Sequence, residues 1–161
     1  MMLDPDFPRH LGGDIHCVSM AIRRALDASI STQVSPELTG TRGMVLGFIS
    51  CRTAEGGSVY QRDVEDFFRI RPPSVTALLK AMEQDGFIVR ANTAQDARLK
   101  SLTLTEKGRT CAQILQICID TFESNLRKGL DDTQLGQLQE MLSLLLQNAN
   151  ALQAGAGSNN L

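Results

Sequence analysis

Pro72–Gly108 reads PPSVTALLKAMEQDGFIVRANTAQDARLKSLTLTEKG, and this stretch decides the predicted fold. It opens with two prolines, which are favoured at the start of a helix because the nitrogens there need no partner within the helix. Apolar residues then recur every three or four positions, which is the period of an amphipathic helix. These residues are Val75, Leu78, Leu79 and Met82. The sequence therefore predicts a helix from Pro72 to Gln84.

A β-ribbon is predicted directly after this helix. Asp85-Gly86 is a turn dipeptide, and two short strands are expected after it, at Phe87–Arg90 and Lys100–Leu104. The polar loop between them carries Asp96 and Arg98. A helix followed by a ribbon with an arginine at its tip is suited to the groove and the backbone of duplex DNA.

A second, shorter helix precedes the Pro72 helix. It is predicted from Gln61 to Phe68, with Val64, Phe67 and Phe68 facing inward. Only Arg69–Arg71 join the two helices, which matches a helix-turn-helix. Together with the ribbon, this pair predicts a winged helix-turn-helix.

Helical segments flank the winged part on both sides. Upstream, a helix is predicted from about His10 to Ser31, and another element begins with Ser35 as N-cap and Pro36 as its first helical residue. Downstream, Thr105 is expected to cap a long helix that Gly129 ends. Asp131 or Asp132 then caps the last helix, in which leucines repeat at Leu135, Leu138, Leu142 and Leu145.

These outer helices are too apolar to face water. A helix-turn-helix is too small to cover them all, so a homodimer with interlocking helical ends is the economical solution. An ordinary hydrophobic core is the alternative explanation of leucines at this spacing. The predicted dimerisation residues are Leu11, Ile15, Leu138, Met141, Leu142 and Leu145.

The predicted fold class is mainly α with a small β-wing, a winged helix-turn-helix plus a helical dimerisation domain. The expected parts are an N-terminal dimerisation helix (1–32), a winged helix-turn-helix DNA-binding region (33–108), C-terminal dimerisation helices (109–150) and a flexible tail (151–161).

Composition narrows the possible functions. Hydrophobic residues make up 42% of the 161 residues, but no apolar run is long enough to span a membrane, so no membrane partner is expected. The acidic N-terminus lacks the apolar segment of a secretion signal, which predicts a cytoplasmic protein. The net charge is −2, yet six basic and three acidic residues lie between Arg69 and Lys100. This local excess has the sign that phosphate binding requires.

The outward face of the Pro72 helix is the candidate DNA-binding surface. At 100° per residue, Pro73, Ala77, Lys80 and Gln84 lie opposite the apolar stripe, flanked by Ser74, Thr76 and Ala81. Such small or polar residues can approach the floor of a groove. Free backbone N–H groups at the start of the helix are expected to hold a phosphate. An ordinary solvated surface helix is the alternative.

Cysteines, histidines and catalytic motifs give weaker signals. Cys17, Cys51, Cys111 and Cys118 form no CxxC pair and are expected to be buried, inert thiols. A redox-sensing regulator is the alternative, and it requires an exposed thiol of low pKa. Two histidines, His10 and His16, are too few for a zinc site, so neither a metal nor a cofactor is expected. No nucleophile elbow, phosphate loop or HExxH motif is present, which argues against an enzyme.

Two motifs resemble the MarR family of bacterial transcription regulators. The first is Asp96-x-Arg98 followed, after five residues, by Leu104-Thr105-x-x-Gly108. The second is Glu83–Arg90, which is similar to the end of the family's recognition helix and its first wing strand. The order of predicted elements is also similar over nearly the whole chain.

This resemblance implies an obligate dimer that binds a pseudo-palindromic operator, with half-sites about 10–10.5 bp apart, and that acts as a repressor. Arg98 matches the wing arginine that reaches the minor groove, and Asp96 the acid that orients it. Residues of the recognition helix would touch bases or phosphates, and Arg71 and Lys100 the backbone. The expected DNA-binding residues are Arg71, Pro73, Ser74, Thr76, Ala77, Lys80, Asp96, Arg98 and Lys100.

The resemblance also implies release of the operator by a small aromatic or anionic effector, or by oxidation of a cysteine. The expected effector-binding residues are His16, Met20, Arg24, Met44, Phe48 and Cys51. An ordinary position on a helix surface or in the core is the alternative for each of them. Cys17 occupies the helix that carries the peroxide-sensing cysteine in one branch, but Tyr60 is the single tyrosine of this chain, whereas that branch surrounds its thiolate with tyrosines. A winged-helix protein-interaction module without DNA binding remains the alternative from another class.

Overall fold

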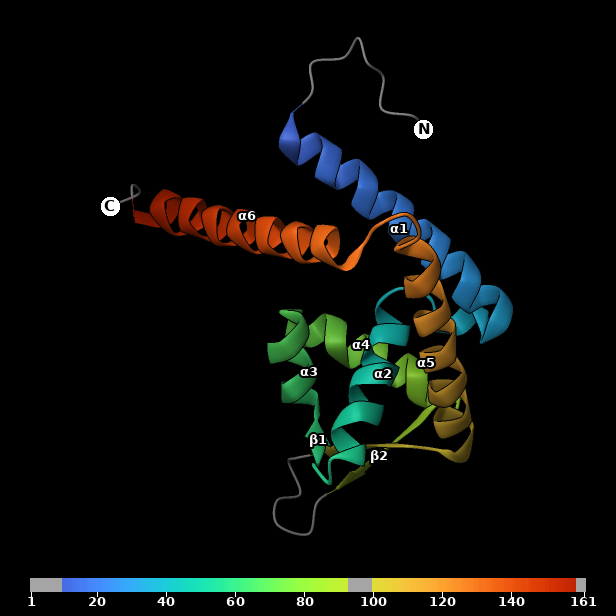
Figure 1. Cartoon of the computed structure of the whole chain (residues 1–161). Helices are drawn as coiled ribbons and strands as arrows, with labels where there is room; N and C mark the ends of the chain where they lie inside the picture. The colour runs from blue at the N-terminus through green and yellow to red at the C-terminus, as the bar shows by residue number, and fades with distance from the viewer. Residues whose placement is uncertain (1–9, 93–99, 159–161) are drawn as a thin grey trace. The chain divides into compact units, whose positions relative to one another are not determined.

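The structure is a computed structural model that describes residues 10–92 and 100–158, and Figure 1 traces the chain. The chain divides into two compact units, residues 1–122 and 123–161. The predicted wing-loop residues Asp96 and Arg98 lie outside the described residues.

The first unit contains all the strands of the described residues and most of the helices. In chain order its elements are α1 (Leu11–Gln33), the 3₁₀ helix η1 (Pro36–Leu38), α2 (Thr41–Ala54), β1 (Val59–Tyr60), α3 (Gln61–Phe68), α4 (Pro72–Gln84), β2 (Ile88–Asn92), β3 (Lys100–Leu104) and α5 (Glu106–Leu126). The last turn of α5 continues into the second unit, which contains α6 (Asp132–Ser158).

The predicted helix-turn-helix is confirmed. α3 and α4 have the predicted bounds. Arg69 ends α3 in the left-handed conformation, with φ of 51°, and turns the chain towards α4. Asp63 stabilises the start of α3, because its carboxylate accepts a hydrogen bond from the Tyr60 N–H at 2.7 Å.

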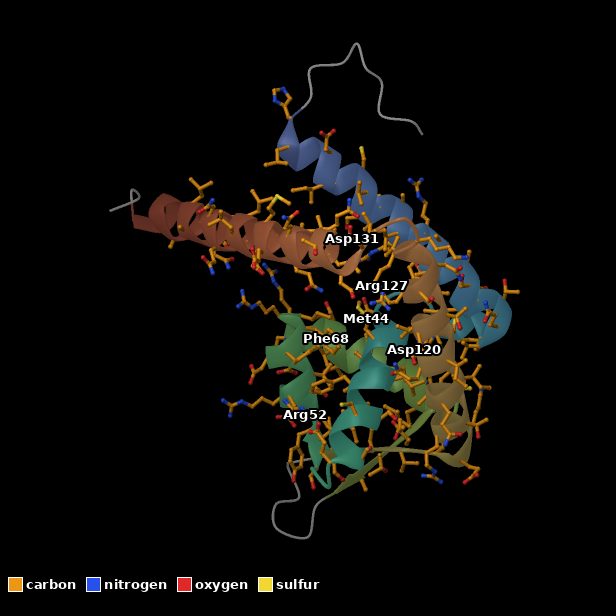
Figure 2. The ribbon with its side chains drawn as sticks, in the orientation of Figure 1. Met44, Arg52, Phe68, Asp120, Arg127 and Asp131 are labelled. Atoms are coloured by element: carbon orange, nitrogen blue, oxygen red, sulfur yellow. The ribbon has the colours of Figure 1, made fainter. Side chains whose placement is uncertain are left out.

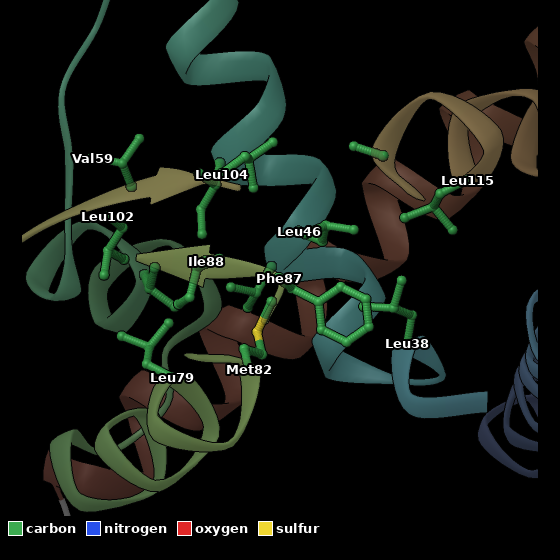
Figure 3. Packing of buried hydrophobic residues seen from close by; sticks show 14 of the residues in the cluster. Leu38, Leu46, Val59, Leu79, Met82, Phe87, Ile88, Leu102, Leu104 and Leu115 are labelled. Atoms are coloured by element: carbon green, nitrogen blue, oxygen red, sulfur yellow. The ribbon is translucent and has the colours of Figure 1, made fainter. Parts of the chain in front are cut away.

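The hydrophobic core of the first unit lies beneath α4. Val75, Leu79 and Met82 have 0% exposed surface, as the helical stripe predicted. Phe87, at the exit from α4, is equally buried, and Figure 3 shows it among the core residues that α2, α4 and the sheet contribute. Because these side chains fix one face of α4, the opposite face is held in a defined direction.

A three-stranded antiparallel sheet of order β1-β3-β2 forms the base of the wing. β2 pairs with β3 in a register that places Ile88 opposite Leu104 and Asn92 opposite Lys100. β1 adds a short edge, with Val59 opposite Leu102. The two predicted strands are thus confirmed, and β1 was not anticipated because a two-residue strand leaves no periodic pattern.

Thr105 caps α5 as predicted. Its hydroxyl accepts a hydrogen bond from the Gly108 N–H at 2.9 Å and donates one to the Gly86 carbonyl at 2.6 Å. Gly108 is needed here because a Cβ at this position would lie 2.0 Å from the Phe87 carbonyl oxygen. The start of α5 is therefore tied to the exit of α4.

Three sequence predictions differ from the structure. Ser35 and Pro36 begin only the short helix η1, and α2 starts separately at Thr41, after Gly40 adopts a φ of 61° that favours glycine. Phe67 does not face inward but is 62% exposed.

In the second unit, α6 continues through Ser158, past the predicted start of the tail at residue 151. Asp131 caps α6, since its carboxylate accepts the Gln134 N–H at 2.8 Å.

Candidate nucleic-acid interface

The outer face of α4 carries the predicted DNA-binding residues of that helix. All of them are exposed to solvent, whereas the residues between them on the inner face are buried; the exposed residues are Pro73, Ser74, Thr76, Ala77 and Lys80. Arg71, the N-cap of α4, and Lys100, the first residue of β3, are also exposed. α4 therefore presents small side chains and one ammonium group on a surface that a groove could receive.

The start of α4 does not offer the backbone donors that the sequence predicted. Pro72 and Pro73 have no N–H group, and the N–H groups of Ser74 and Val75 both donate to the Arg71 carbonyl, at 3.0 and 3.2 Å. The expectation was therefore wrong for residues 72–75, because the two prolines have no N–H and the tight first turn uses those of Ser74 and Val75. Any phosphate near this end would interact with the helix dipole and with Arg71.

Gln61 links the three elements around the candidate interface. Its amide nitrogen donates to the Thr76 hydroxyl at 2.9 Å and to the Glu65 carboxylate at 2.8 Å, and its carbonyl accepts from the Arg90 guanidinium at 3.4 Å. One side chain of α3 thus contacts both α4 and β2. Sequence reasoning missed Gln61, because the partners lie 15 and 29 positions away and leave no local pattern.

This linkage changes the role expected for Thr76. The Thr76 hydroxyl donates to the Pro72 carbonyl at 2.9 Å and accepts from Gln61, so its hydrogen bonds are made within the protein. Thr76 remains exposed on the outer face, where its methyl group can still make apolar contacts. Ser74 and Lys80 are exposed on the same face.

A second group of contacts fixes the exit of α4. The Arg42 guanidinium of α2 forms an ion pair with the Asp85 carboxylate, and Lys107 of α5 donates to the Asp85 carbonyl at 2.8 Å. The Lys107 ammonium also lies 4.2 Å from the centre of the Phe87 ring, a favourable cation–π distance. Glu83 also has a partner within the protein, because its carboxylate accepts a hydrogen bond from the Arg90 N–H at 3.2 Å. Two acidic residues of the segment Arg69–Lys100, Glu83 and Asp85, therefore interact with other residues of the protein.

The expected effector-binding residues lie on two helices. On α1, His16, Met20 and Arg24 are exposed, and the Arg24 guanidinium donates to the Met20 carbonyl of its own helix at 3.2 Å. On α2, Met44 and Cys51 are exposed. Phe48 is half-buried and packs against Phe67, with ring centres 4.6 Å apart.

The cysteines differ in their burial, which corrects the expectation of four buried thiols. Cys118 is buried, and burial raises the pKa of its thiol. Cys17 and Cys111 are half-buried, whereas Cys51 is exposed. The Cys51 thiol donates a hydrogen bond to the Glu55 carboxylate at 3.8 Å.

The predicted dimerisation residues lie on α1 and α6. Leu11 and Ile15 are exposed on α1, and Leu138, Met141 and Leu142 are exposed on α6. Leu145 is partly buried.

Within residues 10–92 and 100–158, no helix combines the length and apolar character needed to cross a bilayer, and no three metal-ligating side chains gather at a point.

Known proteins share this architecture. A family model described as MarR family matches residues 37–99. The S. aureus MepR–DNA complex is 22% identical, covers 88% of this chain and 99% of its own, and has a TM-score of 0.77. The transcriptional repressor CouR, bound to a 23-mer DNA duplex, is 23% identical, covers 85% and 92%, and has a TM-score of 0.73.

A third structure, the transcription regulator MarR from Oenococcus oeni PSU-1, is 25% identical, covers 86% of this chain and 99% of its own, and has a TM-score of 0.66. The matched segment, residues 37–99, begins within η1 and includes the helix-turn-helix and β2. Residues 37–99 therefore match a MarR family model, and the chain has the winged-helix fold of the transcription regulators to which it is similar.

Proposed function

We propose that this protein is a dimeric, non-enzymatic transcription regulator that binds a pseudo-palindromic DNA operator through α4. The observation that carries the proposal is the division of α4 into two faces. Val75, Leu79 and Met82 anchor one face in the core, while the face with Ala77 and Lys80 is exposed. A helix held in this way can enter a major groove without rearrangement of the protein.

Charged residues around α4 have distinct proposed roles. Lys80 reaches phosphate or base edges from the outer face of the helix, and Arg71 and Lys100 contact the backbone beside it. Arg98, oriented by Asp96, reaches the minor groove, as the family resemblance implies. Since phosphate contacts supply affinity and base contacts supply specificity, Lys80 and Ser74 are proposed to contribute most to sequence choice.

A homodimer is proposed because the apolar residues on α1 and α6 are costly to expose. Met141 on α6 and Leu11 on α1 each have more than half of their surface exposed, and burial of such side chains contributes about 1.5–3 kcal/mol each. Two-fold symmetry would place the two α4 helices in successive major grooves, with half-sites about 10–10.5 bp apart.

The proposal includes repression that a small effector relieves. MepR and CouR, which share this fold, are described in complex with DNA, and CouR is described as a repressor. These descriptions support DNA binding by the present chain. Repression would follow if the operator overlapped a promoter.

Selection from random duplexes tests the proposed function. Binding should enrich an inverted repeat, and the affinity for that repeat should fall steeply with salt, since the bound Lys and Arg residues release counterions from the phosphates. A dimer that enriches no sequence and shows no salt-dependent DNA affinity would instead indicate a protein-interaction module.

A further inference from the structure

A cavity of about 580 Å³ lies on the first unit, at the C-terminal end of α2, and none of its lining residues belongs to α4. Binding sites for small molecules typically have volumes of about 300–1,000 Å³, so this cavity has a suitable size. The lining residues come from α2, β1, α3 and the turn before β1; they are Phe48, Arg52, Glu55, Gly57, Ser58, Val59, Asp63, Asp66 and Phe67.

Aromatic rings form one wall of this cavity. Phe48 and Phe67 have ring centres 4.6 Å apart, and Phe68 completes the group at 4.9 Å from Phe67. Phe67 is 62% exposed although it belongs to a phenylalanine cluster. An aromatic face left open beside a cavity favours a flat, apolar ligand, because stacking would remove that face from water.

The charges of the cavity select the sign of such a ligand. Three carboxylates line it, at Glu55, Asp63 and Asp66, against one guanidinium, at Arg52. Asp63 accepts a hydrogen bond from the Tyr60 N–H at 2.7 Å. Asp66 lies 3.5 Å from Arg62, but both side chains are more than 70% exposed, so water screens that pair. The excess negative charge favours a cation and repels an anion.

The chain's own Arg52 shows that a cation can lie against this wall. Its guanidinium lies 5.6 Å from the centre of the Phe48 ring, within the range of a cation–π interaction. Figure 2 labels Arg52 of α2 and Phe68 of α3. Because Arg52 is exposed, a ligand could displace it from the ring without a large loss of packing.

We propose that this cavity is a binding site for a planar aromatic cation. The ligand would stack on Phe67 and Phe48, and Asp66 and Glu55 would balance its charge. Of the positions that the family resemblance implies for a small anionic effector, only Phe48 lines this cavity. The site therefore shares one residue, Phe48, with those positions and prefers the opposite charge.

Occupancy of the site would also affect α3, which contributes Asp63, Asp66 and Phe67 and which supports α4 through Gln61. An effect of the ligand on operator affinity rests on the proposed function, whereas binding of the ligand does not. A binding assay without DNA therefore separates the two proposals.

The test uses the full-length chain, rhodamine 6G as a cationic probe and fluorescein as an anionic probe of similar shape, with fluorescence anisotropy as the readout. Rhodamine 6G should bind and fluorescein should not. Asp66→Asn and Phe67→Ala should each weaken rhodamine binding by about threefold to tenfold, the size expected for one ionic or aromatic contact near solvent. Asp120→Asn, which makes the same charge change on α5 outside the cavity, should leave binding unchanged.

Arg52→Gln tests most directly whether the site prefers a cation. If the ligand is a cation, this variant should bind rhodamine 6G about threefold to fivefold more tightly, because a competing positive charge has been removed from the ring. The proposal would be overturned if Arg52→Gln bound rhodamine 6G more weakly than the wild type, or if the wild type bound fluorescein more tightly than rhodamine 6G. It would also be overturned if the wild type, Asp66→Asn and Phe67→Ala bound rhodamine 6G with equal affinity. Far-ultraviolet circular dichroism of each variant confirms that the fold is retained.

Discussion

Replacing Gly108 with alanine tests the contact that joins α5 to the exit of α4. Gly108 is buried in the first turn of α5, and its N–H donates to the Thr105 hydroxyl at 2.9 Å. An added Cβ would lie 2.0 Å from the Phe87 carbonyl oxygen and 3.0 Å from its carbonyl carbon. Both atoms belong to the main chain, so a rotation of a side chain cannot relieve the overlap.

Two opposing effects determine how much Gly108→Ala changes the free energy of unfolding. Alanine is more favourable than glycine within a helix by about 0.5–1 kcal/mol. Against this, overpacking a fixed site costs about 1–3 kcal/mol. Displacement of the Phe87 carbonyl would also weaken the hydrogen bond that it accepts from the Thr105 N–H at 3.1 Å, a loss of about 1 kcal/mol. Gly108→Ala should therefore lower the free energy of unfolding by about 1–3 kcal/mol.

Gly47→Ala is the matched control, because Gly47 lies within α2 and a Cβ there would meet no atom within 4 Å. This variant should be stabilised by about 0.5–1 kcal/mol. Urea denaturation followed by circular dichroism, at one protomer concentration because a dimer's stability depends on concentration, compares the two. If Gly108→Ala were as stable as the wild type or as Gly47→Ala, the close packing of α5 against Phe87 would be refuted.

Further predictions concern the cap, the core, acid stability, thiol reactivity and DNA binding. Thr105→Ala should cost about 1 kcal/mol of unfolding free energy in urea titrations, as the loss of an N-cap does, and Leu79→Ala about 2–5 kcal/mol because it leaves a cavity in the core. The Ser35 hydroxyl lowers the pKa of Glu37, so this interaction stabilises the fold above the ordinary pKa of glutamate, and the stabilisation is lost as pH falls through the lowered value. In an acid titration, the free energy of unfolding should therefore fall less in Ser35→Ala than in the wild type. Cys51 should react with a maleimide before Cys118, because Cys118 is buried and its thiol has a raised pKa; mass spectrometry showing the reverse order would contradict the assigned burial. Lys80→Ala should reduce the salt slope of operator binding by about one, and an unchanged slope would count against a phosphate contact by Lys80.

The helix-turn-helix could be predicted from sequence because its signals are local. The prolines at Pro72 and Pro73, the apolar stripe of α4 and the Asp85-Gly86 turn each act within a few residues, and α3 and α4 have their predicted bounds. The cap at Thr105 was recognisable for the same reason.

The remaining features depend on contacts between distant residues. Gln61 bonds to Thr76 and Arg90, and Arg42 pairs with Asp85, 43 positions away; no periodic pattern marks such pairs. Phe67 was misassigned because helical spacing alone placed it beside Phe68, whereas the structure leaves it open at the edge of a cavity. The N–H groups of Ser74 and Val75, which were expected to be free at the start of α4, both donate to the main-chain carbonyl of Arg71.

Photo-crosslinking tests the central proposal, that the outer face of α4 contacts DNA, most directly. The photoreactive residue p-benzoylphenylalanine would replace Ala77, which is exposed on that face, or Ala28, which is exposed on α1. With the selected operator bound and irradiated, the Ala77 position should crosslink to DNA at bases within each half-site, and the Ala28 position should not. Operator binding without any crosslink from the Ala77 position, or with equal crosslinking from Ala28, would contradict the role of α4.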